Sequence, residues 1–276
     1  MRTAWMTVVG CLLIGGAVLA QQPVLQPPQQ PPAQDPNQKL LDGALEDWEK
    51  AMSQVLSFEM ILKKTVKDKV FGGAPLVLEG RAYYLKGGAN QLSRASLELT
   101  KAGQPLEVVE KYICTGNYLY QYAPANKKVL VHPMPAPKAG AGQVSDENFA
   151  MFMFGMKSAD AKSRYHMVYD MPAGKPDPYY HYIKVQPRFK QDLEEFTIAR
   201  LAILKSSNLP AQLWMLLPNN NETTFDFAKI TPNVNVPPTY FAVPQLPKDW
   251  QMQQMQPRPA QQPQPPSTVR STGNPK

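Results

Sequence analysis

The sequence has few of the residues that build disulfide-linked, metal-binding or catalytic domains. Its 276 residues include two cysteines, Cys11 and Cys114, and three histidines. No histidines or cysteines have the spacing of a zinc site, and no P-loop, nucleophile-elbow or dinucleotide-binding motif occurs. The sequence therefore predicts a protein that is not an enzyme and that holds no metal and no other cofactor.

Strong charge of one sign is also missing. The chain has 29 Lys+Arg and 22 Asp+Glu residues, with no basic run interleaved with aromatics. We therefore expect no nucleic acid partner, because such a partner selects a clustered basic patch. The aromatic run 179–182 is able to stack on a sugar ring, but aromatics are also ordinary strand formers, and this alternative stays open.

The first 20 residues are typical of a secretory signal peptide. Arg2 precedes an apolar run that ends in small residues at Ala20. We expect cleavage after Ala20 and export to the periplasm, which leaves Cys114 without an internal disulfide partner. The segment before Cys11 resembles a bacterial lipobox, but the apolar run continues past this cysteine, which argues against lipid anchoring there.

Composition divides the remaining chain into one domain and two tails. Residues 21–35 and 251–276 are rich in proline and glutamine and lack apolar periodicity. Such segments bury too little surface to offset the entropy of ordering, so we expect a disordered linker and a disordered tail. Residues 36–250 have enough apolar residues for a single domain with one core.

One helix opens this domain, and strands follow it. Asp35 and Pro36 are typical of a helix start, and apolar residues at three- and four-residue spacing extend the predicted helix to Leu56. Alternating runs separated by glycine turns then predict about ten to eleven antiparallel strands. Several runs are apolar on both faces, so both faces should contact apolar groups. The expected class is α+β, mostly antiparallel β, with a sheet long enough to curl.

An unusually apolar segment, Phe149–Met156, interrupts the strands. A helix that is apolar all round has no face for water, so it is either a core helix or the lid or floor of an apolar cavity. Both interpretations remain open. Methionine-rich surfaces adapt to ligands of variable shape. Burying an acyl chain of some fifteen methylenes would contribute roughly 12 kcal/mol before ordering costs, so such a site needs no polar motif.

Several motifs resemble those of the LolA-like superfamily of periplasmic lipoprotein carriers. Residues 76–86 and 91–99 resemble the family's glycine-containing strand and the arginine-bearing strand after it. The run 116–122 (GNYLYQY) is similar to a later strand of the family, and 241–244 (FAVP) resembles its closing motif. In detail, residues 182–188 also resemble an uncharacterised family of exported planctomycete proteins.

The LolA resemblance implies a curved, incomplete β-barrel whose helices cover an apolar cavity for acyl chains. Arg94 matches the family arginine that holds the inserted helix closed as a lid. The residues implied to line the cavity and its lid are Trp48, Met52, Leu56, Phe149, Phe152, Met153, Phe154 and Met156. The implied function is a periplasmic carrier or binding protein for the acyl chains of a lipid or lipoprotein, with a membrane protein of the envelope as a further partner. The alternative is an envelope sensor or scaffold module of the same fold that carries no cargo.

Overall fold

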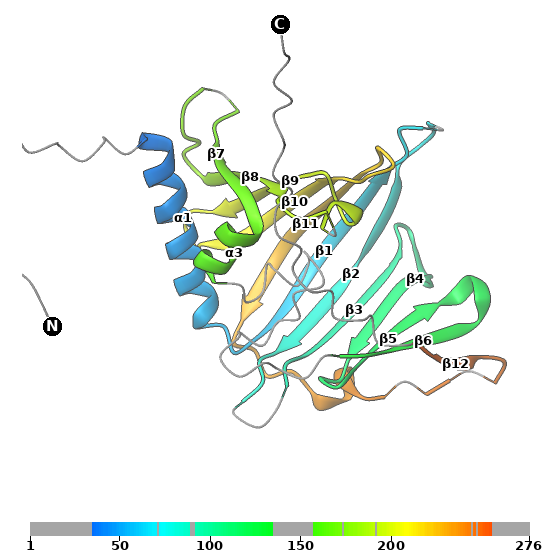
Figure 1. The fold of residues 1–276 in the computed structure, drawn as a ribbon. Coiled ribbons are helices and arrows are strands. Elements are labelled where there is room, and N and C mark those ends of the chain that lie inside the picture. The colour runs from blue at the N-terminus through cyan, green and yellow to red at the C-terminus, as the bar shows by residue number, and fades with distance from the viewer. Residues whose placement is uncertain are drawn as a thin grey trace, which may run out of the picture. The chain divides into compact units, whose positions relative to one another are not determined.

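The computed structural model describes residues 35–70, 72–88, 92–134, 157–172, 174–190, 192–243, 245–246 and 248–255. Within these ranges one sheet of 12 strands lies beside two α-helices (Figure 1). The helices are α1 (Pro36–Ser53) and α3 (Ser158–Arg164), and the 3-10 helices are η1 (Pro124–Asn126), η2 (Asp192–Glu194) and η3 (Pro238–Phe241). The strands are β1 (Ser57–Lys67), β2 (Leu76–Leu85), β3 (Arg94–Lys101), β4 (Gln104–Cys114), β5 (Tyr118–Ala123), β6 (Lys128–Pro133), β7 (Tyr165–Asp170), β8 (Tyr180–Pro187), β9 (Ile198–Leu204), β10 (Leu209–Leu216), β11 (Glu222–Pro232) and β12 (Gln251–Gln254).

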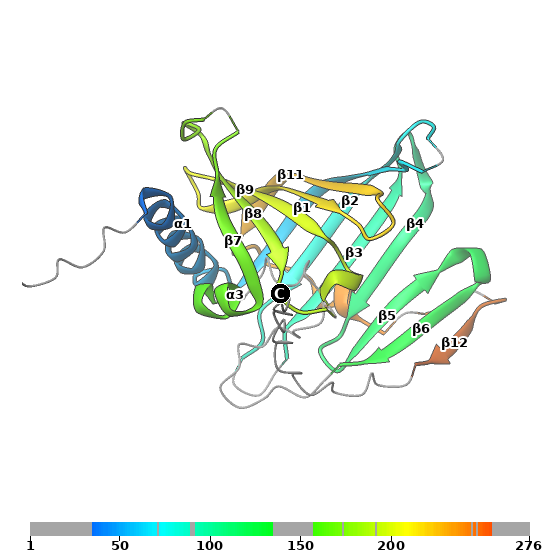
Figure 2. The ribbon, with the colours of Figure 1, turned by 45° about the horizontal axis from the view of Figure 1, so that its top comes forward.

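The sheet is open, with the strand order β12-β6-β5-β4-β3-β2-β1-β11-β10-β9-β8-β7. All neighbouring strands are antiparallel except β12, which runs parallel to β6. Figures 1 and 2 show the sheet strongly twisted, with α1 and α3 beside the β7 end. The predicted α+β class and the incomplete barrel are therefore confirmed. Among the described residues, no helix has both the length and the apolar character that a membrane crossing requires.

Each of the first eleven strands overlaps a predicted run, and the twelfth was missed. The last predicted run, residues 223–228, is shorter than β11. Residues 251–254 pair with β6, so the predicted structureless tail is wrong for these four residues. All four side chains of β12 are exposed. The strand is held at the sheet edge by backbone pairing and by one side-chain hydrogen bond, which Lys128 donates to Gln253 at 3.2 Å. Composition gives no signal for such pairing.

The helix α1 begins as predicted but ends earlier. The side chain of Asp35 accepts a hydrogen bond from the backbone N–H of Asn37 at 2.9 Å and so caps the first turn. The last helical residue is Ser53, and the predicted continuation to Leu56 is wrong. Asn233, just after β11, accepts from the Leu56 N–H at 2.8 Å and donates to the Gln54 carbonyl at 3.3 Å. The side chain of Asn233 thus supplies the hydrogen bonds that another helical turn would have formed.

The two faces of the sheet differ in what covers them. We define the inner face as the one that packs against α1. Its core combines Leu41, Leu45 and Trp48 of α1 with inward side chains from both halves of the sheet. The helix α3 is tied to α1 by the Lys162–Asp42 ion pair (2.6 Å). This end of the sheet is therefore closed by two helices.

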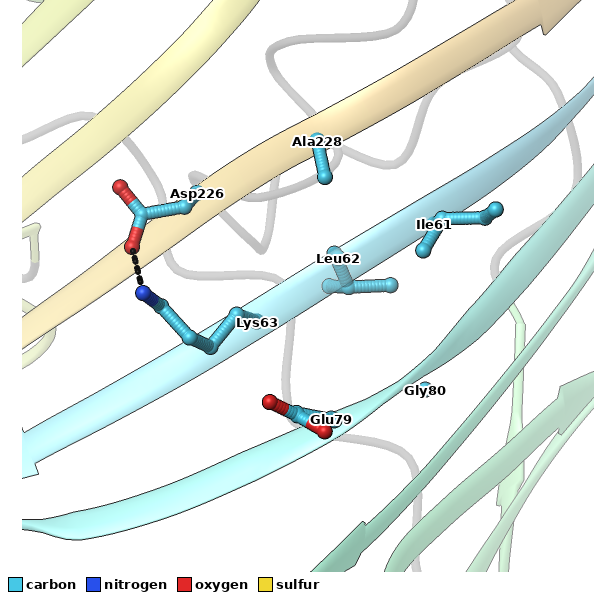
Figure 3. A pocket seen from close by; sticks show the side chains of 7 residues that line it. All are labelled: Ile61, Leu62, Lys63, Glu79, Gly80, Asp226 and Ala228. Carbon is cyan, nitrogen blue, oxygen red and sulfur yellow. Dashed lines mark ion pairs between the residues drawn. The ribbon is translucent and has the colours of Figure 1, made fainter. Parts of the chain in front are cut away.

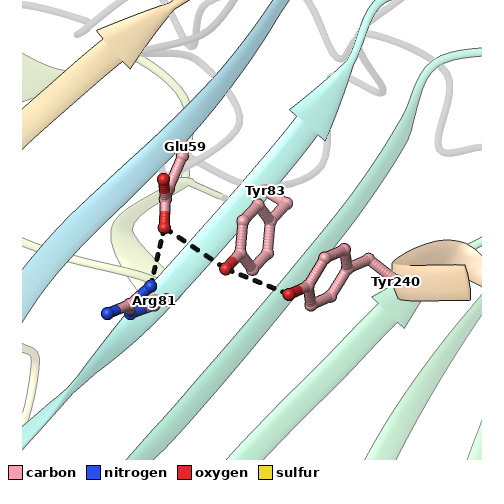
Figure 4. Close-up of polar contacts among 4 residues, drawn as sticks. All are labelled: Glu59, Arg81, Tyr83 and Tyr240. Carbon is pink, nitrogen blue, oxygen red and sulfur yellow. Dashed lines mark hydrogen bonds and ion pairs between the residues drawn. The ribbon is translucent and has the colours of Figure 1, made fainter. Parts of the chain in front are cut away.

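The opposite, outer face carries a second and smaller apolar cluster. Ile113, Tyr120, Val129 and Val131 pack there against Leu246 and Trp250 of the C-terminal strap, which we define as residues 238–243, 245–246 and 248–255. The rings of Tyr83 and Tyr240 stack with centroids 4.0 Å apart, and the Tyr83 hydroxyl also contacts Glu59 (Figure 4). The strap therefore explains why the outer face of β4–β6 is apolar, which agrees with the predicted apolar contacts on a second face. On β1, β2 and β11 the outer face instead carries ion pairs, so the prediction fails for those strands.

Candidate functional site

The inner face beyond α1 offers a continuous apolar floor. Cross-strand register places Leu78 and Leu99 on this face, and both are fully buried. Ala82, Leu97 and Phe225 lie around them and are only partly buried. Because residues two apart on a strand share a face, the floor extends over β11, β1, β2 and β3. These side chains form one continuous apolar layer on the inner face, buried at its centre and partly exposed at its border.

Gly80 allows two strands of this floor to approach closely. A Cβ atom added at Gly80 would overlap the backbone carbonyl oxygen of Glu98 and lie 3.0 Å from the Cα of Leu99. Any larger residue would therefore push β3 away from β2. The glycine predicted for this strand is thus required by the geometry of the sheet.

The predicted ligand residues fall into three groups. Trp48 is buried in the core, and Met52 packs partly buried at its edge. Leu56 is 62% exposed and lies after the end of α1. The remaining predicted residues, which make up the apolar segment, lie outside the described residues: Phe149, Phe152, Met153, Phe154 and Met156. Of the three predicted ligand residues that the structure describes, Trp48 and Met52 belong to the inner-face core and Leu56 does not.

Arg94, the predicted lid-holding residue, contacts the C-terminal strap. Its guanidinium carbon lies 5.4 Å from the centroid of the Phe241 ring, and Phe241 is itself buried. This cation–π contact helps to hold η3 on the sheet. The predicted contact of Arg94 with a lid helix involves residues outside those described, so that role stays a prediction.

Polar side chains on the inner face were not singled out from the sequence. The ammonium group of Lys64 lies 2.6 Å from the carboxylate of Glu110. Farther along the sheet the side chains of Gln121 and His132 are hydrogen bonded at 3.3 Å. Burial raises the pKa of the Tyr112 hydroxyl, with the nearby Glu110 carboxylate adding to the effect. The sequence of β1 contained a signal for the inward position of Lys64, since this residue is in phase with the inward residues of that strand.

Two shallow hollows of the described residues lie on the outer face. One, of about 270 Å³, is bordered by Ile61, Glu79 and Ala228 and by the Lys63–Asp226 ion pair (Figure 3). The other, of similar size, has Tyr182 and Gln212 in its wall and shares Asp226. Neither hollow is lined by a residue that the sequence predicted for the apolar cavity. Tyr180 and Tyr182 in the wall of the second hollow belong to the aromatic run 179–182, for which sugar stacking remains an alternative.

Reactive chemistry has little support among the described residues. No group of three or more metal-binding side chains occurs in the ranges that the structure describes. Cys114 is buried, and burial raises the pKa of its thiol, which disfavours the nucleophilic thiolate. The arrangement is suited to binding an amphiphilic molecule, with an apolar floor and charged groups at one place on it.

Comparisons with known proteins give weak similarities. No protein-family model matches the chain, and no curated protein matches it. One similar solved structure is an uncharacterised conserved protein from Thermus thermophilus, with 12% identity, a TM-score of 0.44, and 78% of this chain and 98% of that chain covered. Another is a LolA superfamily protein from Nitrosomonas europaea, with 11% identity, a TM-score of 0.35, and coverage of 74% and 97%. The lipoprotein LppX from Mycobacterium tuberculosis has 12% identity, a TM-score of 0.38, and coverage of 72% and 99%. The resemblance to planctomycete proteins stays a prediction.

Proposed function

We propose that this protein is an exported, non-catalytic binding or carrier protein that holds the acyl chains of a lipid or lipoprotein on the inner face of its sheet. The observation that carries the proposal is the apolar floor. Its centre, at Leu78 and Leu99, is fully buried, while Leu97 and Phe225 beside it are only partly buried. Partly buried apolar side chains on a curved sheet gain free energy when a hydrocarbon chain covers them.

The proposal is tested with an uncharged probe, so that only the chain is recognised. Delipidated protein is titrated with a monoacylglycerol that carries a fluorescent acyl chain. We expect saturable binding, and we expect Leu97→Asp to weaken it about tenfold or more, because a carboxylate on the floor must lose its water. If Leu97→Asp does not fold, Leu97→Trp serves instead. Its larger side chain covers the floor without adding charge and should also weaken binding of the probe.

Leu106→Asp is the matched control, because Leu106 is 97% exposed on β4. This variant should bind the probe like the unmodified protein. If no saturable binding occurs, or if both leucine positions respond equally, the inner face is not the site. The predicted segment is tested separately with Phe152→Asp and Met153→Asp together, which should abolish binding if that segment covers the chain.

The sensor or scaffold alternative places function in the tail. Pull-downs with and without the tail distinguish it from the carrier. The truncation should start at Gln256, because removing residues 251–254 would also remove β12 from the sheet edge. Capture of an envelope partner that depends on the tail, without bound lipid, would favour the alternative.

A further inference from the structure

The ion pair between Lys64 and Glu110 differs from its neighbours in position. Register pairs Lys64 with Leu78 and Phe225, and pairs Glu110 with Leu99, so both charged groups belong to the inner face. Lys64 is on β1 and Glu110 is on β4, so the bridge passes over β2 and β3. It therefore lies directly above the apolar floor.

Ion pairs on the outer face are more exposed. The side chains of Lys63 and Asp226 are 47% and 32% exposed, and they join adjacent strands. Those of Lys64 and Glu110 are 17% and 24% exposed. Removing two charges from water costs about as much as their attraction returns, so a partly buried pair is weak evidence for a stabilising role. Its position points instead to ligand recognition.

Both groups keep hydrogen-bonding capacity after they pair. A lysine ammonium has three donors, and the bond to Glu110 uses one. A carboxylate accepts about four hydrogen bonds, and Lys64 supplies one. The ammonium also lies 5.5 Å from the centroid of the Phe225 ring, at the border of the floor. One charge of each sign is thus available beside a surface suited to hydrocarbon.

We propose that Lys64 and Glu110 bind the head group of a zwitterionic phospholipid, with the phosphate on Lys64 and the ammonium on Glu110. This inference rests on the proposed function, because the acyl chains occupy the same floor. The pair has no net charge, so an anionic head group meets the repulsion of Glu110 as well as the attraction of Lys64. A zwitterion satisfies both groups at once, because each of its charges faces an opposite one.

The test compares two probes with identical fluorescent acyl chains, phosphatidylethanolamine and phosphatidylglycerol, bound to the delipidated full chain. We expect the unmodified protein to bind phosphatidylethanolamine about tenfold more tightly, as one charge-assisted hydrogen bond allows. Glu110→Gln leaves Lys64 unopposed and should reverse the preference. If Glu110→Gln does not fold, Lys64→Met, with a similar apolar stem, serves instead. It should weaken the binding of both probes, because both carry a phosphate, and it should keep the preference for phosphatidylethanolamine, because Glu110 still attracts the ammonium and repels the anion.

Asp226→Asn is the matched control, because it makes the same charge change on the opposite face, beside Lys63. It should leave the preference unchanged. Equal binding of both probes by the unmodified protein would overturn the head-group site while leaving the proposed function intact. An equal response of Glu110→Gln and Asp226→Asn would also overturn it, as an effect of net charge. If neither phospholipid nor the monoacylglycerol binds, the proposed function itself fails.

Discussion

Replacing Gly80 by alanine should destabilise the fold through a single methyl group. The new Cβ would overlap the carbonyl oxygen of Glu98 and approach its carbonyl carbon to 2.9 Å. Both atoms belong to the backbone of β3, so relief requires the two strands to separate. Overpacking costs about 1–3 kcal/mol, and each ladder hydrogen bond lost adds about 1 kcal/mol. We therefore expect a loss of about 3 kcal/mol, or roughly 6–12 °C in the melting temperature for a domain of this size.

Gly43→Ala provides a control of opposite sign. Gly43 lies in the exposed part of α1, and a Cβ there would meet no atom within 4 Å. Alanine in an exposed helix interior stabilises by about 0.5–1 kcal/mol relative to glycine. Both variants can be followed by urea unfolding with circular dichroism. A Gly80→Ala protein within about 1 kcal/mol of the unmodified chain would refute the close approach of β2 and β3.

Two further predictions concern charged groups at the helix end of the sheet. Asp192 is buried and accepts two hydrogen bonds from Arg164, at 2.7 and 3.0 Å. Asp192→Ala leaves the arginine unpaired and should lower the free energy of unfolding by about 3–5 kcal/mol. A loss below about 1 kcal/mol would contradict the importance of this pair. Burial, with a smaller contribution from Lys205, lowers the pKa of His181, whose Nδ1 lies 3.0 Å from the Tyr169 hydroxyl. The unfolded chain therefore binds the proton first, and stability should fall as the pH drops below about 6.5. The free energy of unfolding in urea should depend less steeply on pH in His181→Gln. Identical pH profiles of the two proteins would show that His181 does not cause the loss of stability.

Local patterns were sufficient to predict most of the sheet. Eleven strands follow from alternation and glycine turns, because a half-buried strand shows its faces every second residue. The start of α1 follows from Asp35 and Pro36 for an equally local reason. The end of α1 depends on Asn233, 177 residues from the Leu56 amide that it accepts from. Such distant control of a helix end is invisible to a short sequence window.

The candidate head-group site could be predicted only in part. The inward phase of Lys64 is readable from its own strand, where Met60 and Leu62 precede it at every second position. Its pairing with Glu110 is not readable, because it needs the register of β1 through β4. The apolar outer face of β4–β6 was visible as a pattern, but the strap that covers it was not. Tyr240 and Trp250 stand in a proline-rich segment without periodicity.

A bulge in β11 explains why the strand predicted from alternation ended too early. It also explains why the inner face remains continuous. The predicted strand stopped at residue 228, because Phe225 and Phe227 are two apart but the next inward residue, Ile230, is three further on. In the structure β11 continues to Pro232, and the register against β1 shifts at Ala228. The extra residue changes the phase of the strand. It keeps Ile230 on the core side while Phe225 stays beneath Lys64. Without this bulge, one of the two residues would face solvent, and the floor and the core could not share one face.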